Sequence, residues 1–444
     1  MKGLFKLLAV LLFAICLLGN VFAGGGQQKG SNDAKTLKFF GWGAGTDLNS
    51  EEQRLTRIFE KYYQETGVRV TGDFNDDYWE VLELKVPSGS SDYDVMVVDL
   101  AGISNYAVRG GFLIPLDKYF TRAELDGYVP VAKKAATWDG KFYAPPLNNS
   151  SQILWWNQDL LDQAGVKVRP SDVNNRLTYE EVVEYARQAL SKLDPNRTNG
   201  ISGLIFEQVS MTYQMLPIPN SMGAKNIGDD GFTVDGIINS PEWVKAMTWY
   251  QNLFKDGLAL RGFTTMEVPN LFNSGKIIFM VGGTWNDPSV VNRTFKVGFA
   301  PVPAFKGYED KVGTATGSWH IGVVPSSKKQ DLAAAFVKWM TLGEGNSLYT
   351  FGDKQLNIIG TGQLPATMAQ VNSILNDPNA NPVMKIAVYE STHTAVPRAI
   401  TPGYNEYHTI MDATFEDIRN GSDVKPRLDR AVRDINSALV RYKR

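Results

Sequence analysis

Cysteine, histidine and excess positive charge are scarce in this sequence. Its 444 residues include one Cys and three His. One Cys excludes a disulfide within the chain, and so few Cys and His side chains almost exclude a metal cage built from them. The 45 Lys and Arg residues face 47 Asp and Glu residues, a formal net charge of −2. A protein that binds a polyanion would carry a basic surplus, so we expect no nucleic acid partner.

Long apolar runs are scarce as well. The clearest one, residues 7–18, follows a short basic start and is shorter than the ~20 residues that span a membrane. Residues 21–23 fit the small-residue cleavage rule. We therefore predict a signal peptide at residues 1–23, a flexible leader at 24–35 and a secreted, periplasmic protein. Cys16 lies inside the apolar run, which leaves a lipid anchor at the cell surface as the alternative location.

Aromatic residues, by contrast, are abundant. The sequence has 10 Trp, 18 Tyr and 22 Phe, together 11% of the chain. Trp and Tyr combine a flat apolar face with a polar group, so more of them than a core needs suggests a binding cleft. The hydrophobic fraction of 43% is enough for a large core. At about 150 residues per domain, the length predicts two or three domains.

Strand and helix patterns alternate along the chain. A β-rich run at residues 36–40 precedes a helix that Ser50 opens and Gly67 ends, and strands at 68–70 and 93–99 enclose a helical pattern at 79–86. Later segments continue the alternation, with strands at 277–281, 297–300 and 321–324 and with helices opened by Thr178 and by Ser240, at 333–340, 406–418 and 426–442. This order predicts an α/β protein of two lobes with parallel sheets covered by helices.

Familiar catalytic and cofactor motifs are incomplete. The run from Gly41 to Gly45 resembles a dinucleotide loop, but Thr46 replaces its last glycine. The Asp73-x-Asn75-x-Asp77 pattern lacks the turn glycine and the final Glu of a calcium loop. The sequence also lacks an H-E-x-x-H pair and a G-x-S-x-G elbow. We therefore expect no cofactor, no metal and no enzyme activity, although a glycosidase carboxylate pair needs geometry that the sequence does not give.

Candidate ligand-binding residues follow the predicted strands. Parallel sheets bind ligands beyond the carboxyl ends of their strands, and sugars need aromatic platforms with polar partners. The candidates chosen by this rule are Trp42, Asp47, Asp99, Asn148, Asn149, Glu207, Tyr213, Trp285 and Asp287, with Trp319 at a strand entrance. Purely structural roles remain open as alternatives: Asp99 could cap a helix, Trp319 could fill a corner of the hydrophobic core, and Asn148 and Asn149 could pair with the nearby backbone.

Five segments in the same order resemble those of the extracellular solute-binding proteins of ABC importers, in the maltose-binding-like, carbohydrate-associated group. They are YDVMVVDLAGISNYAVRGGFLIPLDKYF (93–120), DGKFYAPPLNNSSQILWWNQDLLDQAGV (139–166), LFNSGKIIFMVGGTW (271–285), TGSWHIGVVPSSKKQDLAAAFVKWM (316–340) and VPRAITPGYNEYHTIMDATFEDIRNG (396–421). The resemblance implies a two-lobed periplasmic-binding-protein fold with a multi-strand hinge. It also adds Arg398 and Tyr404 to the candidate ligand-binding residues, and supports a stacking role for Trp285.

The resemblance further implies a domain plan and a function. The N-terminal lobe should comprise residues 36–147 and about 316–342, and the C-terminal lobe 148–315 and 343–444. The crossings are expected near residues 145–151, 301–317 and 341–345. We expect a monomer that captures a carbohydrate by hinge closure and delivers it to the membrane subunits of an ABC permease. The alternatives are the same scaffold with a polyamine, peptide or metal complex as cargo, or a secreted glycoside hydrolase.

Overall fold

The computed structural model describes residues 33–85, 93–109, 112–289 and 291–443. The expected signal peptide, the candidate anchor Cys16 and most of the expected leader lie outside the described residues. Within the described ranges, no helix is long and apolar enough to cross a membrane.

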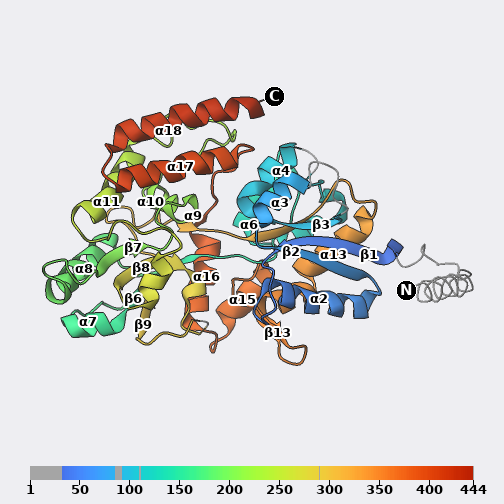
Figure 1. Cartoon of the computed structure of the whole chain (residues 1–444), viewed down its shortest axis with the longest axis horizontal. Helices are drawn as coiled ribbons and strands as arrows, with labels where there is room; N and C mark the ends of the chain where they lie inside the picture. Colours follow the sequence, from blue (N-terminus) through green and yellow to red (C-terminus); the bar gives the residue numbers. More distant parts are fainter. Residues whose placement is uncertain (1–32, 86–92, 110–111, 290, 444) are drawn as a thin grey trace, which may run out of the picture.

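The described residues form two lobes, each built on a four-stranded sheet (Figure 1). The first sheet has the order β11-β3-β1-β2, with β1 (Thr36–Trp42), β2 (Arg69–Asn75), β3 (Val95–Asp99) and β11 (Trp319–Val323). Strand β1 pairs in parallel with both β2 and β3, and β11 returns antiparallel to β3. The carboxyl ends of β1 and β3 therefore lie at one edge of this sheet.

The second sheet has the order β7-β8-β6-β9. We expected a parallel sheet, but only one of its three strand pairings is parallel. Its strands are β6 (Gln152–Asn157), β7 (Ser202–Phe206), β8 (Ile277–Gly283) and β9 (Val297–Ala300). Strands β7 and β8 are parallel, but β6 lies between β8 and β9 and runs antiparallel to both. As a result β7, β8 and β9 share one direction, and β6 enters the sheet from the opposite end.

Helices cover both sheets. Around the first sheet lie α2 (Glu51–Thr66), α3 (Tyr78–Lys85), α4 (Ile103–Arg109), α5 (Arg122–Asp126), α6 (Pro130–Ala135), α13 (Gln330–Leu342) and α14 (Glu344–Phe351). Around the second lie α7 (Gln158–Ala164), α8 (Tyr179–Leu193), α9 (Thr212–Met215), α10 (Pro217–Asn220), α11 (Pro241–Lys255), α12 (Val268–Asn273), α15 (Met368–Asn376), α16 (Pro382–His393), α17 (Tyr404–Arg419) and α18 (Val424–Leu439). Short 3-10 turns are η1 (Asp33–Lys35), η2 (Leu100–Gly102), η3 (Asp117–Tyr119), η4 (Thr284–Asn286) and η5 (Val440–Tyr442). Two-residue strands pair as β4 (Thr137–Trp138) with β5 (Lys141–Phe142), β10 (Thr314–Ala315) with β14 (Ala395–Val396), and β12 (Gly352–Asp353) with β13 (Ile358–Ile359).

The helix boundaries follow the predicted caps. The Ser50 hydroxyl accepts the Gln53 backbone N–H at the start of α2, and Gly67 ends this helix in the left-handed conformation with φ of 69°. Thr178 and Glu181 form the expected reciprocal capping box at the start of α8. These local predictions are confirmed.

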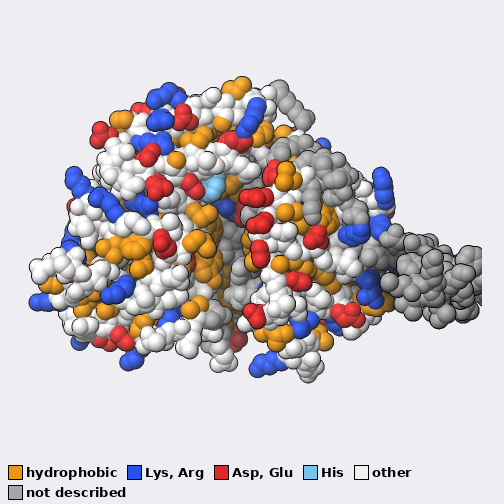
Figure 2. Space-filling model, in the orientation of Figure 1, with side chains coloured by type: hydrophobic (Ala, Val, Ile, Leu, Met, Phe, Trp, Pro, Cys, Tyr) orange, Lys and Arg blue, Asp and Glu red, His pale blue; other side chains and the backbone are white. Residues whose placement is uncertain are grey.

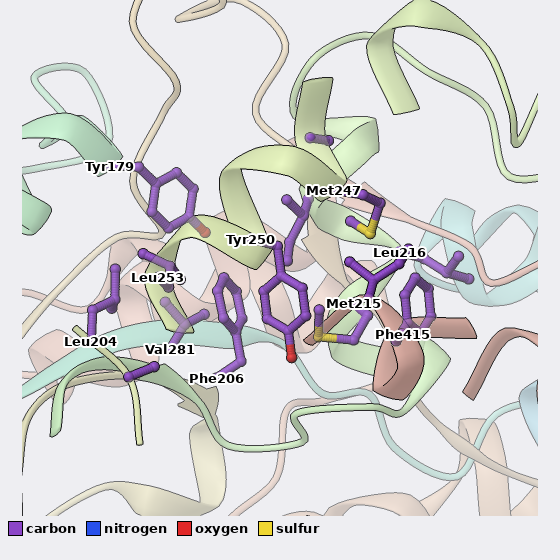
Figure 3. Close-up of a cluster of buried hydrophobic side chains, with 14 of the residues drawn as sticks. Tyr179, Leu204, Phe206, Met215, Leu216, Met247, Tyr250, Leu253, Val281 and Phe415 are labelled. Atoms are coloured by element: carbon purple, nitrogen blue, oxygen red, sulfur yellow. The ribbon is translucent and has the colours of Figure 1, made fainter. Parts of the chain in front are cut away.

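Each lobe has a separate aromatic-rich core. In the second lobe, α8 and α11 press Tyr179 and Tyr250 against the sheet residue Phe206 (Figure 3). In the first lobe, Phe39 on β1 packs edge-on against Phe59 on α2, with ring centroids 5.0 Å apart. Burial of these large side chains holds each lobe together, so the lobes can move as units.

Three segments cross between the lobes side by side. The first, residues 145–151, forms bridges to the second at residues 317 and 320 and to the third at residue 364. The first two crossings agree with the prediction, but the expected crossing at residues 341–345 is wrong. That segment joins α13 to α14, and both helices pack in the first lobe's core. The chain crosses instead after β13, so residues 344–359 also belong to that core rather than to the C-terminal lobe as expected.

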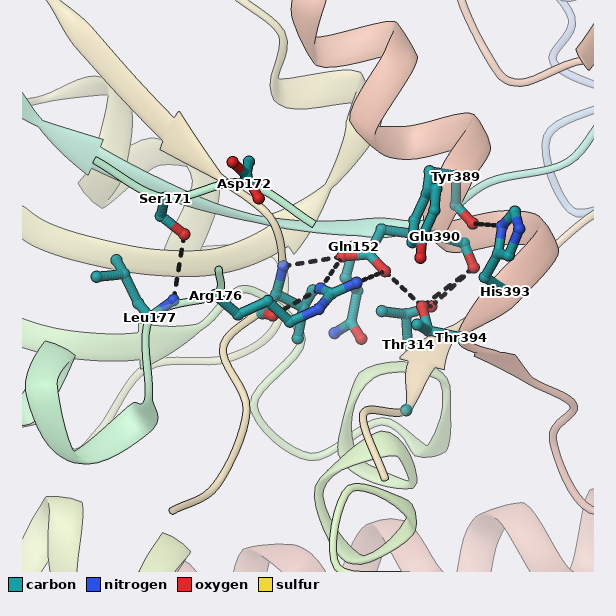
Figure 4. Close-up of polar contacts among 12 residues, drawn as sticks. Gln152, Ser171, Asp172, Arg176, Leu177, Thr314, Tyr389, Glu390, His393 and Thr394 are labelled. Atoms are coloured by element: carbon teal, nitrogen blue, oxygen red, sulfur yellow. Dashed lines mark hydrogen bonds and ion pairs between the residues drawn. The ribbon is translucent and has the colours of Figure 1, made fainter. Parts of the chain in front are cut away.

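A buried ion pair ties the second crossing to the C-terminal lobe (Figure 4). Arg176 contacts the carboxylate of Glu390 on α16, whose side chain is fully buried. Glu390 also accepts the backbone N–H of Val302 at 3.1 Å and the hydroxyl of Thr394 at 2.5 Å. One carboxylate therefore links the loop before α8, the chain after β9 and the end of α16.

Candidate functional site

The lobes face each other across a hollow. Figure 2 shows hydrophobic side chains along one wall of this hollow and acidic side chains along the rim of the first lobe. The carboxyl ends of β1, β3 and β8 and the crossing segments supply most of the predicted ligand-binding residues, so the strand-end rule brought together residues from both lobes.

Trp42 and Trp319 form a stacked pair in the first lobe. Trp42 ends β1 and Trp319 begins β11, and their ring centroids lie 5.0 Å apart with an interplanar angle of 28°. The indole nitrogen of Trp42 is buried and has no hydrogen-bond partner among the described residues. Two rings stacked in this way present a broad apolar face.

Tyr213 and Trp285 form a second stacked pair, in the other lobe. Their ring centroids lie 6.1 Å apart with an interplanar angle of 29°. The Tyr213 hydroxyl lies 2.8 Å from the hydroxyl of Ser150, which in turn donates to the carbonyl of Gly317 at 2.6 Å. Sequence reasoning missed Ser150, although it falls within a predicted crossing.

The two pairs belong to one aromatic strip across the hinge. A Cβ atom at Gly317 would lie 2.6 Å from the Tyr213 ring, so the absence of a side chain there lets the ring lie against the crossing segment. Trp319 follows two residues later, a separation of about 6.6 Å along an extended chain. We call Trp42, Trp319, Tyr213 and Trp285 the aromatic strip: two stacked pairs, one from each lobe, with Gly317 of the crossing segment between them in the chain.

Glu207 holds the second half of this strip in place. Its carboxylate, in a side chain only 2% exposed, accepts the indole N–H of Trp285 at 2.8 Å. It also accepts N–H groups from the Gly283 backbone at 2.8 Å, from Asn286 at 2.8 Å and from Gln214 at 3.0 Å. These contacts make Glu207 a positioning group for Trp285. Sequence reasoning had placed it in direct contact with ligand and missed Asn286 and Gln214.

Asp99 and Arg398 form an ion pair between the lobes. The Arg398 guanidinium donates to Oδ1 of Asp99 at 2.6 Å. The same oxygen accepts the Ala101 backbone N–H at 2.9 Å and so caps η2. Arg398 also lies over the rings of Tyr213 and Tyr404, 5.6 Å from each centroid. The helix-capping alternative for Asp99 is therefore confirmed, and the same carboxylate also pairs with Arg398.

The remaining predicted residues bind mainly to other protein groups. Asn148 accepts the Trp319 backbone N–H at 2.9 Å and donates to Gln363 at 2.6 Å, so it joins the crossing segments. Asn149 accepts the Thr316 hydroxyl at 2.8 Å, and its own amide nitrogen has no partner among the described residues. Asp287 accepts N–H groups from Ser289 and Asn381, and Asp47 is exposed in the loop after β1.

A partly buried polar chain extends from the predicted residues Arg398 and Tyr404 to Thr212, His408 and Asp412, which sequence reasoning missed. Arg398 donates to the Tyr404 hydroxyl at 3.4 Å, and the Thr212 hydroxyl lies 2.8 Å from that oxygen and 2.7 Å from His408 Nδ1. His408 Nε2 lies 3.4 Å from Asp412. Burial raises the pKa of Asp412 to about 7, and burial with the nearby Arg398 lowers the pKa of His408 to about 4. The four-residue spacing of Tyr404, His408 and Asp412 on α17 was the available signal.

A large cavity between the lobes also reaches Arg398. It has a volume of about 1320 Å³ and is lined by α6, the β4–β5 hairpin, residues 220–232 and residues 396–402. Arg398 is the one predicted ligand-binding residue that lines it, and the aromatic strip lies outside it. Two of its lysines are paired with carboxylates, Lys133 with Asp126 and Lys225 with Asp229. In the described parts of the chain, no cluster of His, Cys, Asp and Glu fits a metal ion.

Two lobes joined by three crossing segments are the architecture expected of a solute-binding protein. The family model of bacterial extracellular solute-binding proteins matches residues 46–347. The protein belongs to this family, whose members bind solutes outside the cytoplasm.

Known relatives are distant. The chain is 24% identical over 311 residues to a mannitol-binding protein of Pseudomonas aeruginosa, covering 65% of each chain. It is 22% identical over 422 residues to the sn-glycerol-3-phosphate-binding periplasmic protein of Rhizobium meliloti, covering 90% of this chain and 93% of that protein. The first curated relatives, binding proteins of Brucella, are 24% identical, and the match spans 58% of their length.

Solved structures confirm the fold. A cyclo/maltodextrin-binding protein complexed with maltotetraose aligns with a TM-score of 0.71 at 22% identity, covering 92% of this chain and 98% of that chain. The two-lobed periplasmic-binding-protein architecture expected from the sequence is therefore confirmed.

Proposed function

We propose that this protein is the substrate-binding component of an ABC importer and that it captures a neutral carbohydrate, such as a sugar, oligosaccharide or polyol, between its lobes. The aromatic strip Trp42, Trp319, Tyr213 and Trp285 carries the proposal. Sugars present apolar C–H faces that pack on aromatic rings, and hydroxyl rims that need hydrogen-bond partners. The aromatic strip supplies rings for the apolar C–H faces, and Arg398 supplies N–H donors for the sugar hydroxyls.

Ligand charge follows from the Asp99–Arg398 pair. Relatives of this chain include proteins named for mannitol and for sn-glycerol-3-phosphate, which differ in charge. Arg398 could neutralise a phosphate, but Asp99 already lies 2.6 Å from its guanidinium and would repel an anion. A hydroxyl can still accept from the remaining guanidinium N–H groups without a change in net charge. The site geometry therefore favours a neutral polyhydroxylated ligand over a phosphorylated one.

Capture requires the lobes to move about the three crossing segments. Ser150 and Asn149 pair with Gly317 and Leu364 across these segments, so a small rotation in the hinge changes the separation of the two aromatic pairs. Closure would bury the sugar between the lobes. A sugar that lacks one hydroxyl would then leave the protein group facing that position unpaired, at a cost of about 1–3 kcal/mol for each such group. A monomer in the periplasm, released after removal of residues 1–23, would then deliver the ligand to the permease.

Tryptophan fluorescence and thermal unfolding test this function. We expect D-mannitol, maltose or maltotetraose to change the fluorescence of the purified protein and to raise its melting temperature, and sn-glycerol-3-phosphate to do neither. Trp285→Ala should abolish the response, and Trp339→Phe, which changes a residue packed on α2, should preserve it. Tight binding of sn-glycerol-3-phosphate, or no response to a broad panel of neutral sugars and polyols, would contradict the proposal.

A further inference from the structure

The polar chain behind Arg398 joins three separate elements. Tyr404, His408 and Asp412 lie on one face of α17, and Thr212 lies at the start of α9. Thr212 contacts all three of them: its hydroxyl lies 2.8 Å from the Tyr404 oxygen and 2.7 Å from His408 Nδ1, and its backbone N–H donates to Asp412 at 3.2 Å. The His408 and Tyr404 rings also stack, with centroids 5.7 Å apart.

Donor and acceptor capacities fix the direction of this chain. Arg398 can only donate, so the Tyr404 oxygen accepts from it and the Tyr404 O–H must donate to Thr212. The Thr212 O–H finds an acceptor in this chain when Nδ1 of His408 is unprotonated, so this is the tautomer that pairs every hydroxyl. His408 therefore carries its proton on Nε2, which faces Asp412. Each hydroxyl has one hydrogen, so every donor in the chain points from Arg398 toward Asp412.

One added proton on the His408–Asp412 pair reverses the chain. A hydrogen on Nδ1 would donate to the Thr212 oxygen, and the Thr212 O–H would lose its acceptor. The Thr212 O–H regains an acceptor in this chain only by donating to the Tyr404 oxygen. The Tyr404 O–H would be left facing the Arg398 guanidinium, which offers no acceptor. The contact between Tyr404 and Arg398 would be lost, and only Asp99 would then hold the guanidinium.

We propose that Thr212 and His408 are positioning residues of the ligand site, because they fix the Tyr404 hydroxyl that, together with Asp99, directs the Arg398 guanidinium toward the ligand. The inference rests on the proposed function only in assigning Arg398 to ligand binding. The positioning itself is a property of the ligand-free protein.

Proton uptake by the pair should therefore weaken the site. The charged and titratable groups that face it are Arg398 and Asp99 beside His408, and Glu416 beside Asp412. Arg398 opposes a positive His408, whereas Glu416 favours a protonated Asp412. As the pH falls, Asp412, whose pKa is raised to about 7, takes up a proton before His408, whose pKa is lowered to about 4. A protonated Asp412 carboxyl that donates to Nε2 leaves the hydrogen of the neutral His408 ring on Nδ1.

The test follows the side-chain Nε resonance of Arg398 by NMR and the binding of D-mannitol and maltotetraose between pH 7.5 and 5. Arg398→Lys assigns the resonance by removing it. In the wild-type protein we expect the resonance to move, and binding to weaken on the order of tenfold, as the pH falls. His408→Asn keeps an acceptor near Nδ1 but has no second ring nitrogen to relay the proton of Asp412, so both readouts should lose the pH dependence that this network gives them. His393→Asn, at an exposed histidine on α16, should behave as wild type.

Variants of Thr212 provide a second test of the positioning role, with the Arg398 resonance as the readout. Thr212→Val removes the hydroxyl at constant shape and should shift the Arg398 resonance at every pH, whereas Thr212→Ser should restore it. A His408→Asn variant with the wild-type pH dependence, or a Thr212→Val variant with an unshifted resonance, would overturn the proposal. If neither carbohydrate binds the wild-type protein at any pH, the proposed function fails, and the Arg398 resonance of the ligand-free protein still decides the positioning role.

Discussion

The carboxylate of Glu207 accepts the indole N–H of Trp285 at 2.8 Å and so fixes the orientation of a ring at the end of β8. The same carboxylate accepts three further N–H donors, from the Gly283 backbone and from the side chains of Asn286 and Gln214. A buried carboxylate that is bonded in this way is satisfied by protein donors alone. The ring it holds is consequently preorganised, and less side-chain freedom is lost when a ligand stacks on it.

Glu207→Gln should destabilise the C-terminal lobe and weaken ligand binding together. The amide has one acceptor oxygen, and its NH₂ group would face N–H donors, so at least two buried donors lose their partner. We expect the free energy of unfolding to fall by about 2–4 kcal/mol, measured by urea denaturation. Glu60→Gln, at an exposed position on α2, is the matched control and should be neutral. Unchanged stability in Glu207→Gln would show that this network contributes little.

Local patterns in the sequence predicted much of the fold but not the contacts that assemble the site. Caps such as Ser50 and Thr178 act within one helix, so a short window of sequence contains their whole cause. Asp99 and Arg398, by contrast, are 299 residues apart and meet only because two lobes fold against each other. Strand ends indicated where to look, but only the folded chain could show that Glu207 accepts the indole N–H of Trp285.

The third crossing shows why the domain plan was partly wrong. Residues 360–366 read GTGQLPA, with neither an apolar run nor a β-branched residue beyond Thr361, so no strand pattern marks them. Their pairing depends on backbone bonds between Asn149 and Leu364, at 2.7 and 2.9 Å. Backbone pairing of this kind leaves almost no trace in side-chain composition.

Removal of one half of the aromatic strip should weaken carbohydrate binding with little effect on folding. Trp42 is partly exposed and stacks on Trp319, so Trp42→Ala removes a platform from the rim of the first lobe's core. We expect affinity for the best neutral sugar to fall on the order of tenfold, and Trp42→Phe to recover most of it. Calorimetric titration measures both. Equal affinities for wild type and Trp42→Ala would exclude Trp42 from the site.

Removing one partner of the buried Arg176–Glu390 pair should destabilise the protein strongly, whereas replacing both partners by apolar side chains should destabilise it much less. Glu390→Leu leaves a cation that is 9% exposed without its partner, and we expect a loss of about 3–5 kcal/mol in the free energy of unfolding. The double variant Arg176→Met, Glu390→Leu removes both charges and should recover most of that loss. Urea denaturation of the two single variants and the double variant gives the coupling energy. Additive losses would mean that the two charges do not stabilise each other.

Acid should destabilise the hinge through His320. This side chain is fully buried at the second crossing, where Nδ1 bonds to the Ala144 carbonyl at 2.7 Å and Nε2 to the Ser318 hydroxyl at 2.6 Å. Burial lowers its pKa from 6.5 to about 4. Between these values the unfolded chain binds a proton that the native state does not, so the contribution of His320 to stability is present above pH 6.5 and is lost as the pH falls toward 4.

Urea denaturation between pH 4.5 and 7.5 measures this linkage. The slope of the unfolding free energy against pH should be lower in His320→Asn than in the wild type by up to one proton, or ~1.4 kcal/mol per pH unit. His393→Asn, which changes an exposed histidine, should keep the wild-type slope. Parallel curves for wild type and His320→Asn would show that His320 is not the group that responds to acid.

Asp99→Asn should change the charge preference of the site. The amide oxygen can still cap η2 through the Ala101 N–H, so the local fold is preserved, but Arg398 loses its counter-charge. We expect sn-glycerol-3-phosphate to bind the variant on the order of tenfold more tightly than the wild type, and neutral sugars to bind it more weakly. The gain should shrink as ionic strength rises, because it depends on an uncompensated charge. Asp159→Asn, which removes an exposed carboxylate on α7, controls for net charge. If the anion binds both proteins equally, Asp99 does not set the ligand charge, and the preference for neutral ligands must come from another part of the cleft.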